Sequence, residues 1–178
     1  MPRLSKRRLL PGLIALLTVA FIASLWPSFH ASSGPVVQVG DEAPPFSLMS
    51  DAGQAIQLTD FRGKFVILNF WATWCPPCVE EMPSLERFHD RFAARGVVVL
   101  GVSVDEDRSA YQQFLQKTGV QFPTARDPER NVSRLYGTFK YPETYFIDRT
   151  GKVVQKVIGP ANWTDQQMLD YMEQLLRG

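Results

Sequence analysis

The sequence predicts an α/β protein, a three-layer sandwich with a central mixed β-sheet, and two observations carry this prediction. Two continuous apolar runs, 64–72 and 97–105, flank a segment with helical periodicity, which is the order of a βαβ unit with parallel strands. Further along, two β-rich runs around a turn and a closing amphipathic helix add antiparallel strands. A sheet with both parallel and antiparallel neighbours is therefore expected.

The N-terminal segment 1–28 differs in composition from the rest. Basic residues at its start precede an uncharged apolar run, 9–26, a pattern that predicts an export signal or a membrane anchor. As a helix this run would be about 27 Å long, close to the ~30 Å of a hydrocarbon core. An uncleaved anchor and a signal cleaved near Ala31 both remain open. In either case the basic end should stay in the cytoplasm and the rest of the chain should lie outside.

Residues 29–38 have the composition of a linker, so the folded domain is expected to cover residues 39–178. Of the 178 residues, 45% are hydrophobic and 21% are charged, as is usual for a globular protein. The net charge of +1 argues against a nucleic-acid binder that relies on phosphate neutralisation.

The domain should open with a β-hairpin, because short alternating runs at 46–50 and 54–58 flank a turn signal at 51–53. The run 64–72 is continuously apolar and rich in β-branched and aromatic residues. It therefore predicts a central strand that is buried on both faces.

The next elements complete the βαβ unit. Apolar residues at three- and four-residue spacing predict a helix over about 77–95, which Gly96 ends. The run 97–105 predicts a second buried strand. The amphipathic segment 108–117 predicts another helix, which stops at Gly119.

The C-terminal part predicts two strands and a helix. The strands, 143–148 and 151–159, share a turn, so they should pair as a hairpin. Thr164 and Gln167 have the spacing of a capping box and are expected to open a last helix that runs to about residue 176.

The two cysteines of the chain, Cys75 and Cys78, lie three positions apart between the first buried strand and the first long helix. A closed zinc site needs four ligands, and the only histidines are His30, in the linker, and His89, inside the helix. A purely structural disulfide would close a loop of two residues and would stabilise the fold little, because that stabilisation grows with loop length. A redox pair is the explanation that the surroundings favour.

The start of a helix suits a reactive cysteine. At that position Cys75 would lie beside unpaired backbone N–H groups and the positive end of the helix dipole, which stabilise a thiolate and lower its pKa. Cys78, one turn further in, should be less exposed. Pro76 and Pro77 fit the entry of a helix, where no intrahelical N–H bond is lost, and they should hold the two sulfurs within disulfide reach.

At these residues the sequence resembles a known family. "FWATWCPPC" is similar to the active-site motif of thioredoxin-fold proteins. The longer stretch 58–83, "LTDFRGKFVILNFWATWCPPCVEEMP", resembles the TlpA/ResA-like exported thiol-disulfide oxidoreductases, which include the CcmG/DsbE cytochrome c maturation proteins. "YPETYFID", 141–148, matches the second signature of the family, in which the proline is cis. The resemblance extends from about Val39 to the C-terminus and implies a thioredoxin-like fold.

The resemblance also implies roles for single residues. Cys75 would be the attacking cysteine and Cys78 the resolving one, while Pro142 would be the cis-proline that faces them. The backbone of Tyr141 would then be free to pair with an extended substrate, as in β-augmentation. Trp74 would cover one of the sulfurs.

Acidic residues near the cysteines are further candidates. Thioredoxin carries a buried acid six positions before its first cysteine, where this chain has Asn69. Glu81, three residues after Cys78, matches a glutamate that in ResA-like proteins is thought to handle protons; the alternative is an ordinary solvated helix residue. Glu143 follows Pro142 and is expected to be exposed, where it could shape substrate preference. Trp74, Pro76, Tyr141 and Glu143 are thus the predicted substrate contacts.

The predicted reaction is the reduction of disulfides in extracytoplasmic proteins by thiol–disulfide exchange, with no metal or cofactor. The resemblance implies a location in the bacterial cell envelope, apocytochrome c as substrate, and re-reduction by a membrane electron donor of the CcdA/DsbD type. Two alternatives share the fold. A peroxiredoxin-like thiol peroxidase would need Thr-x-x-Cys, but Thr73 lies only two positions before Cys75. The other alternative is a factor for copper-centre assembly.

Overall fold

The computed structural model describes residues 36–50 and 53–177, all of which belong to the second of two units of the chain, 34–178. The predicted signal or anchor segment, 1–28, lies outside the described residues, as does most of the predicted linker. Within the described part of the chain, no helix is long and apolar enough to cross a membrane. Val37 is already buried, and its N–H donates to the carbonyl of Tyr136.

The centre of the domain is a five-stranded sheet with the strand order β5-β4-β3-β6-β7. Strand β4 runs parallel to β3 and β5, whereas β6 runs antiparallel to β3 and β7. The predicted mixed sheet is therefore confirmed. The strands are β3 (Phe65–Trp71), β4 (Val97–Ser103), β5 (Thr124–Arg126), β6 (Glu143–Ile147) and β7 (Val153–Ile158).

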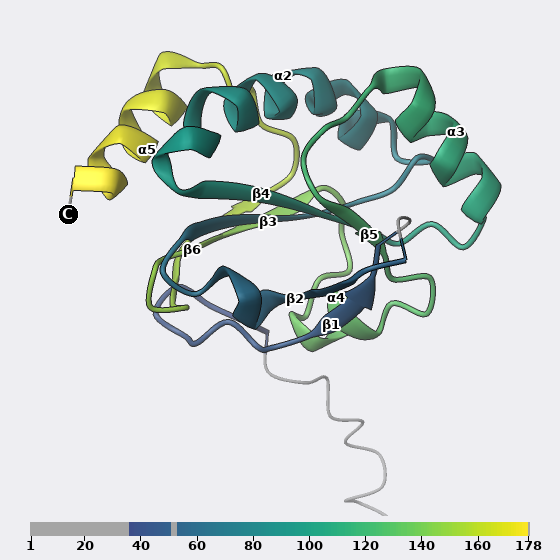
Figure 1. The fold of residues 1–178 in the computed structure, drawn as a ribbon, viewed down its shortest axis with the longest axis horizontal. Helices are drawn as coiled ribbons and strands as arrows, with labels where there is room; N and C mark the ends of the chain where they lie inside the picture. The colour runs from purple at the N-terminus through teal and green to yellow at the C-terminus, as the bar shows by residue number, and fades with distance from the viewer. Residues whose placement is uncertain (1–35, 51–52, 178) are drawn as a thin grey trace, which may run out of the picture. The chain divides into compact units, whose positions relative to one another are not determined.

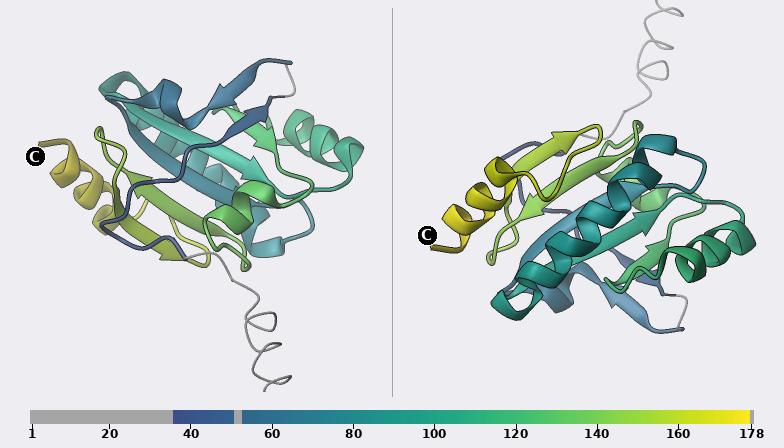
Figure 2. Two further views of the ribbon diagram at one scale, coloured as in Figure 1. Left: turned by 90° about the horizontal axis from the view of Figure 1, so that it is seen from below. Right: turned by 90° about the horizontal axis from the view of Figure 1, so that it is seen from above.

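The sheet is the middle of three layers (Figure 1). The long helices α2 (Pro76–Phe92), α3 (Arg108–Thr118) and α5 (Gln166–Arg177) lie together over one face, as the right-hand view of Figure 2 shows. The other face is covered by the hairpin of β1 (Ser47–Met49) and β2 (Ala55–Gln57), with short helical segments beside it. Both elements of the predicted N-terminal hairpin are present.

Strand β3 contributes side chains to the cores on both faces of the sheet. All seven of its residues are buried, as the apolar run predicts. Its side chains alternate between two cores: Ile67 and Trp71 pack with the helices, while Leu68 and Phe70 pack with the opposite layer. Every second position of the strand therefore faces α2, and Asn69 is one of them.

Several elements differ from the sequence prediction. Three short elements were not predicted: strand β5, helix α4 (Asn131–Leu135) and the 3-10 helix η3 (Leu58–Phe61). Each is too short to show a periodicity in the sequence. Helix α2 ends in a 3-10 turn, η4 (Ala93–Arg95), before Gly96 adopts φ 81°.

The predicted capping box before α5 was wrong. The hydroxyl and N–H of Thr164 both donate to Oδ1 of Asn162, so Thr164 belongs to a turn outside the helix. The carbonyl of Asp165 accepts the first helical hydrogen bond, from the Leu169 N–H, and α5 begins at Gln166.

Candidate active site

Cys75 and Cys78 form a disulfide at the junction of β3 and α2. Cys75 is the N-cap residue of α2 with an extended backbone, Pro76 and Pro77 follow at the first two helical positions, and Cys78 lies in the first turn. Cys75 is 6% exposed and Cys78 is fully buried, so Cys75 is the more accessible of the two cysteines. This is the arrangement that the proline pair predicts.

The second signature lies beside the disulfide loop. The peptide bond between Tyr141 and Pro142 is cis, as the resemblance implies. The ring of Trp74, the residue before Cys75, meets the ring of Tyr141 edge to face with 6.0 Å between centroids. This contact joins the two loops. Trp74 is nevertheless 56% exposed, so it presents an aromatic surface next to Cys75.

Trp71 has a different place from Trp74. It is fully buried at the end of β3, and its ring packs against Tyr111 and Phe114 of α3. It therefore belongs to the core beneath the site.

Glu81 is buried, which excludes the alternative of a solvated helix residue. Its side chain is 4% exposed, while the neighbouring Glu80 is exposed. Oε1 accepts a hydrogen bond from Nδ2 of Asn69 at 2.9 Å. Oε2 accepts from the Ala161 N–H at 3.0 Å and from Nε1 of Trp163 at 3.3 Å. All three donors are uncharged.

The environment of Glu81 favours a proton on its carboxyl group. Burial raises the pKa of Glu81, because a charge loses its hydration there, and the hydrogen bonds from Ala161, Asn69 and Trp163 oppose this rise only in part. Glu81 stands on the same helix as Cys78, three residues further on, and positions three apart share a helix face. It is thus a candidate to exchange a proton with the cysteine pair.

The expectation that Glu143 is exposed was wrong. Glu143 is 3% exposed, and its Oε1 lies 2.6 Å from Nζ of Lys156 and accepts a hydrogen bond from the Tyr145 hydroxyl at 2.7 Å. The alternation of β6 is the reason: Thr144 points toward α2, so its neighbours Glu143 and Tyr145 point to the opposite layer. A substrate at the surface cannot reach this carboxylate directly.

Asp105, just after β4, is a buried residue of the site that sequence analysis missed. Its carboxylate accepts hydrogen bonds from the N–H of Thr73 at 3.0 Å, the hydroxyl of Thr73 at 2.7 Å and the hydroxyl of Ser103 at 2.6 Å. It fixes the loop that leads from β3 to Cys75. An acidic residue directly after a buried strand was the available signal.

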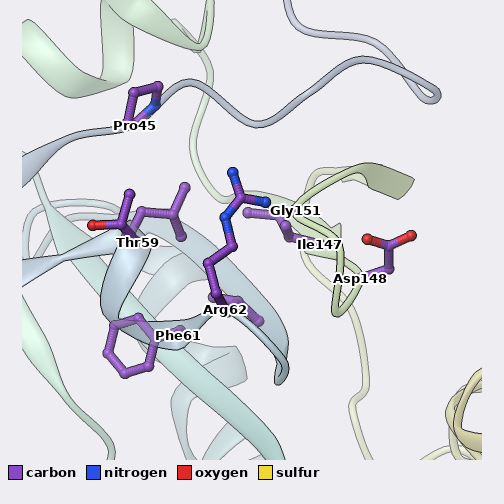
Figure 3. Close-up of a pocket in the computed structure, with 9 residues that line it drawn as sticks. Pro45, Thr59, Phe61, Arg62, Ile147, Asp148 and Gly151 are labelled. Carbon is purple, nitrogen blue, oxygen red and sulfur yellow. The ribbon is translucent and has the colours of Figure 1, made fainter.

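One hollow lies away from the disulfide. A cavity of about 20 Å³, shown in Figure 3, lies at the far ends of β3 and β6, where Val66 and Ile147 contribute to its lining. The guanidinium of Arg62 lies over Gly151 and donates to the Thr150 carbonyl, so a side chain at residue 151 would collide with it. Within 36–50 and 53–177, no three His, Cys, Asp or Glu side chains gather as a metal site requires.

A mixed sheet of this order, a disulfide at the N-terminus of the helix after its central strand, and a cis-proline beside it define a thioredoxin-fold thiol-disulfide oxidoreductase. Comparison with known proteins agrees. Residues 39–156 match the AhpC/TSA family. The chain is 34% identical over 174 residues to the thiol-disulfide oxidoreductase ResA of Bacillus anthracis, covering 97% of this chain and 99% of that one. Its identity to ResA of Bacillus subtilis (strain 168) is 35% over 175 residues, covering 97% and 96%.

A solved structure supports the same assignment. The putative thiol:disulfide interchange protein DsbE from Chlorobium tepidum matches with a TM-score of 0.74 and 31% identity, over 79% of this chain and 99% of that one. The chain belongs to the AhpC/TSA family and is a relative of the ResA-type thiol-disulfide oxidoreductases.

Proposed function

We propose that this protein reduces disulfides of extracytoplasmic proteins, with Cys75 as the nucleophile and Cys78 as the resolving cysteine. The observation that carries the proposal is the disulfide itself: it joins a partly accessible Cys75 at the start of α2 to a buried Cys78, with a buried carboxyl group one turn further on. The accessible sulfur suits attack on a substrate, and the buried one suits the intramolecular step.

The first step is attack by the Cys75 thiolate on the substrate disulfide. A bond forms between Sγ of Cys75 and one substrate sulfur, the substrate S–S bond breaks, and the other substrate sulfur leaves as a thiolate that takes up a proton. Pro76 and Pro77 have no N–H, so the amide of Cys78 is the first that α2 can offer to the Cys75 thiolate. The helix dipole adds to this stabilisation.

The second step releases the substrate. The thiol of Cys78 gives its proton to the Glu81 carboxylate, and the resulting thiolate attacks Sγ of Cys75. The Cys75–Cys78 bond forms, the mixed disulfide breaks, and the second substrate sulfur leaves. The substrate has gained two electrons, and the enzyme must receive two before the next cycle.

The substrate would bind along the surface of Trp74, Pro76 and Tyr141. Trp74 and Pro76 are exposed beside Cys75, and the backbone of Tyr141 can pair with an extended chain. Glu143 would act indirectly: through the hydroxyl of Tyr145, which also bonds to the Tyr136 carbonyl, it supports the loop that carries Tyr141.

The cellular setting follows from the N-terminal pattern and from kinship. Residues 1–28 would anchor the chain in the cytoplasmic membrane or export it, 29–38 would act as a linker, and 39–178 would form the catalytic domain on the outer side. Apocytochrome c would be the substrate, with a copper-centre protein as the alternative. A membrane protein of the CcdA/DsbD type would return electrons to the cysteine pair.

Trapping tests the function. Cys78→Ala should accumulate a mixed disulfide between Cys75 and the substrate, because the second step cannot occur, and mass spectrometry of that complex identifies the partner. Cys75→Ala is the control and should trap nothing and reduce no model disulfide. Reductase activity retained in Cys75→Ala would refute the assigned nucleophile. Rapid peroxide consumption by the wild-type protein would instead favour a thiol peroxidase.

A further inference from the structure

The amide of Asn69 lies between the side chains of Glu81 and Thr144, in the helix-side core. Asn69 is fully buried on β3, and Thr144 is its direct partner on β6. Nδ2 of Asn69 donates one hydrogen to Oε1 of Glu81 and the other to Oγ1 of Thr144, both at 2.9 Å. Among the described residues, Oδ1 of Asn69 has no hydrogen-bond partner although it is buried.

The donors around Glu81 respond differently when the carboxylate takes up a proton. The N–H of Ala161 and Nε1 of Trp163 are held by the backbone and by an indole ring, and neither can become an acceptor. The Asn69 amide carries a donor and an acceptor on the same planar group. If it turns by half a rotation, it presents Oδ1 where Nδ2 was.

We propose that Asn69 is a positioning residue that turns its side-chain amide when Glu81 gains or loses a proton, so that Glu81 is hydrogen-bonded in both states. This inference rests on the proposed function, because it describes how the residue assigned to proton exchange is held in place.

The hydrogen bonds balance in both states. With Glu81 ionised, the two Nδ2 hydrogens of Asn69 go to Glu81 and to Thr144. With Glu81 protonated, Oδ1 accepts the new hydrogen from Oε1 of Glu81, and its second lone pair accepts the hydroxyl hydrogen of Thr144, which rotates to donate. One end of the amide is unpartnered in either orientation, so turning exchanges one unpaired atom for another and adds none.

The charged and titratable groups near Glu81 are few. On α2 these groups are the two cysteines, one turn earlier, together with Glu80 and Arg87. Glu80 and Arg87 line a hollow of about 290 Å³ that is also lined by Glu81 and residues 160–162. Strands β3 and β6 contribute only the neutral Asn69 and Thr144, and the segment 161–163 contributes a backbone N–H and an indole. Glu81 lines this hollow, which is open to solvent, and Cys75 is not among its lining residues.

The direct test is nuclear magnetic resonance on the reduced full-length protein, titrated with acid in detergent micelles. The side-chain carboxyl carbon of Glu81 and the side-chain amide of Asn69 should titrate with one shared midpoint. Contacts between the Nδ2 hydrogens and the Thr144 side chain should be present above that midpoint and lost below it. In Glu81→Gln the Asn69 amide should no longer titrate. Contacts that persist unchanged through the titration of Glu81 would overturn the turning amide.

A substitution gives an independent readout. Asn69→Asp keeps the shape but places a second carboxylate against Glu81, so the Glu81 midpoint should rise by at least one pH unit, a tenfold change in proton affinity. The pH profile of the Cys78-dependent step should move with it. A loss of packing alone would lower stability without moving this midpoint. An Asn69→Asp midpoint equal to that of the wild type would contradict the contact.

The outcomes separate this inference from the proposed function. If the Asn69 amide stays fixed but Glu81→Gln abolishes the pH dependence of disulfide exchange, the turning amide is overturned and the role of Glu81 is intact. If the Asn69 amide turns but Glu81→Gln keeps the wild-type pH profile of disulfide exchange, the inference about Asn69 is supported and the proton role of Glu81 is overturned.

Discussion

Two buried glutamates lie on opposite faces of the same end of the sheet, and their surroundings differ. Glu81, on the helix side, is held by uncharged donors from Asn69, Ala161 and Trp163. Glu143, on the other side, is in contact with the cation of Lys156. Uncharged donors leave the negative charge of a buried carboxylate uncompensated, whereas an adjacent ammonium group compensates it. The two glutamates are therefore equally buried but differ in the charge of their partners.

The largest effect on stability is expected when the positive charge that compensates Glu143 is removed. Lys156→Met should destabilise the fold by about 3–5 kcal/mol, because Glu143 is left as an unpaired buried charge. Urea unfolding measures this loss. The double variant Lys156→Met/Glu143→Gln is the control and should recover a large part of it, since no charge is then left unpaired. A Lys156→Met protein as stable as the wild type would break the comparison, because the ion pair would then be unimportant.

Asp105 sharpens the comparison as a third buried carboxylate with uncharged donors. Thr73→Val removes the hydroxyl that donates to it at 2.7 Å and should lower the free energy of unfolding by about 1.5–3 kcal/mol, as expected for a hydrogen bond to a charged group. The rate of alkylation of Cys75 should change too, because the loop before it loses a support. Thr73→Ser retains the hydroxyl and should behave as the wild type. A Thr73→Val protein as stable as the wild type would contradict the contribution of this hydroxyl.

For Glu81 the expected effect on stability depends on pH. The raised pKa means that the folded protein holds this proton more tightly than the unfolded chain does. The contribution is therefore present below the unfolded pKa of about 4.3 and is lost as the pH rises through the folded pKa. The loss amounts to about 1.4 kcal/mol for each pH unit that separates the two pKa values. Glu81→Gln should remove this loss and gain stability relative to the wild type on the alkaline side. It should also change the pH profile of disulfide exchange.

The matched control for Glu81 is its neighbour on the helix. Glu80 is exposed, so Glu80→Gln should leave both the stability difference and the pH profile nearly unchanged. Parallel denaturation series for the two variants across the range from acid to mildly alkaline pH separate a buried group from a surface charge. Identical behaviour of the two variants would remove the distinction drawn for Glu81.

The smallest effect on stability is expected outside both glutamate sites. Trp74 is 56% exposed, and Trp74→Ala should change the free energy of unfolding by less than about 1 kcal/mol. Because its ring adjoins Tyr141 beside Cys75, the KM for a protein disulfide should rise about fivefold, which corresponds to the loss of one aromatic contact. The rate with a small disulfide should stay the same. An equal loss with both substrates would mean that Trp74 supports the cysteines and not the substrate.

Local pattern in the sequence was sufficient for much of this protein. The apolar run of β3, the helical spacing of α2 and the two signatures around Cys75 and Pro142 are properties of short segments, so they predict strand, helix and redox site without knowledge of their neighbours. The same patterns left open whether Glu81 is solvated or buried, and they led to the wrong expectation for Glu143.

Only the tertiary structure decided those points, because burial and pairing depend on residues far away in the chain. Asn69 and Trp163, which hold Glu81, come from β3 and from the segment before α5, and Lys156, which pairs with Glu143, comes from β7. The alternation of a strand assigns neighbouring side chains to opposite faces, but what each face contains is determined by the packing of the layers. The sequence by itself determined the cysteine pair and its scaffold; the packing of the layers decided that Glu81 is buried among uncharged donors and that Glu143 is buried beside Lys156.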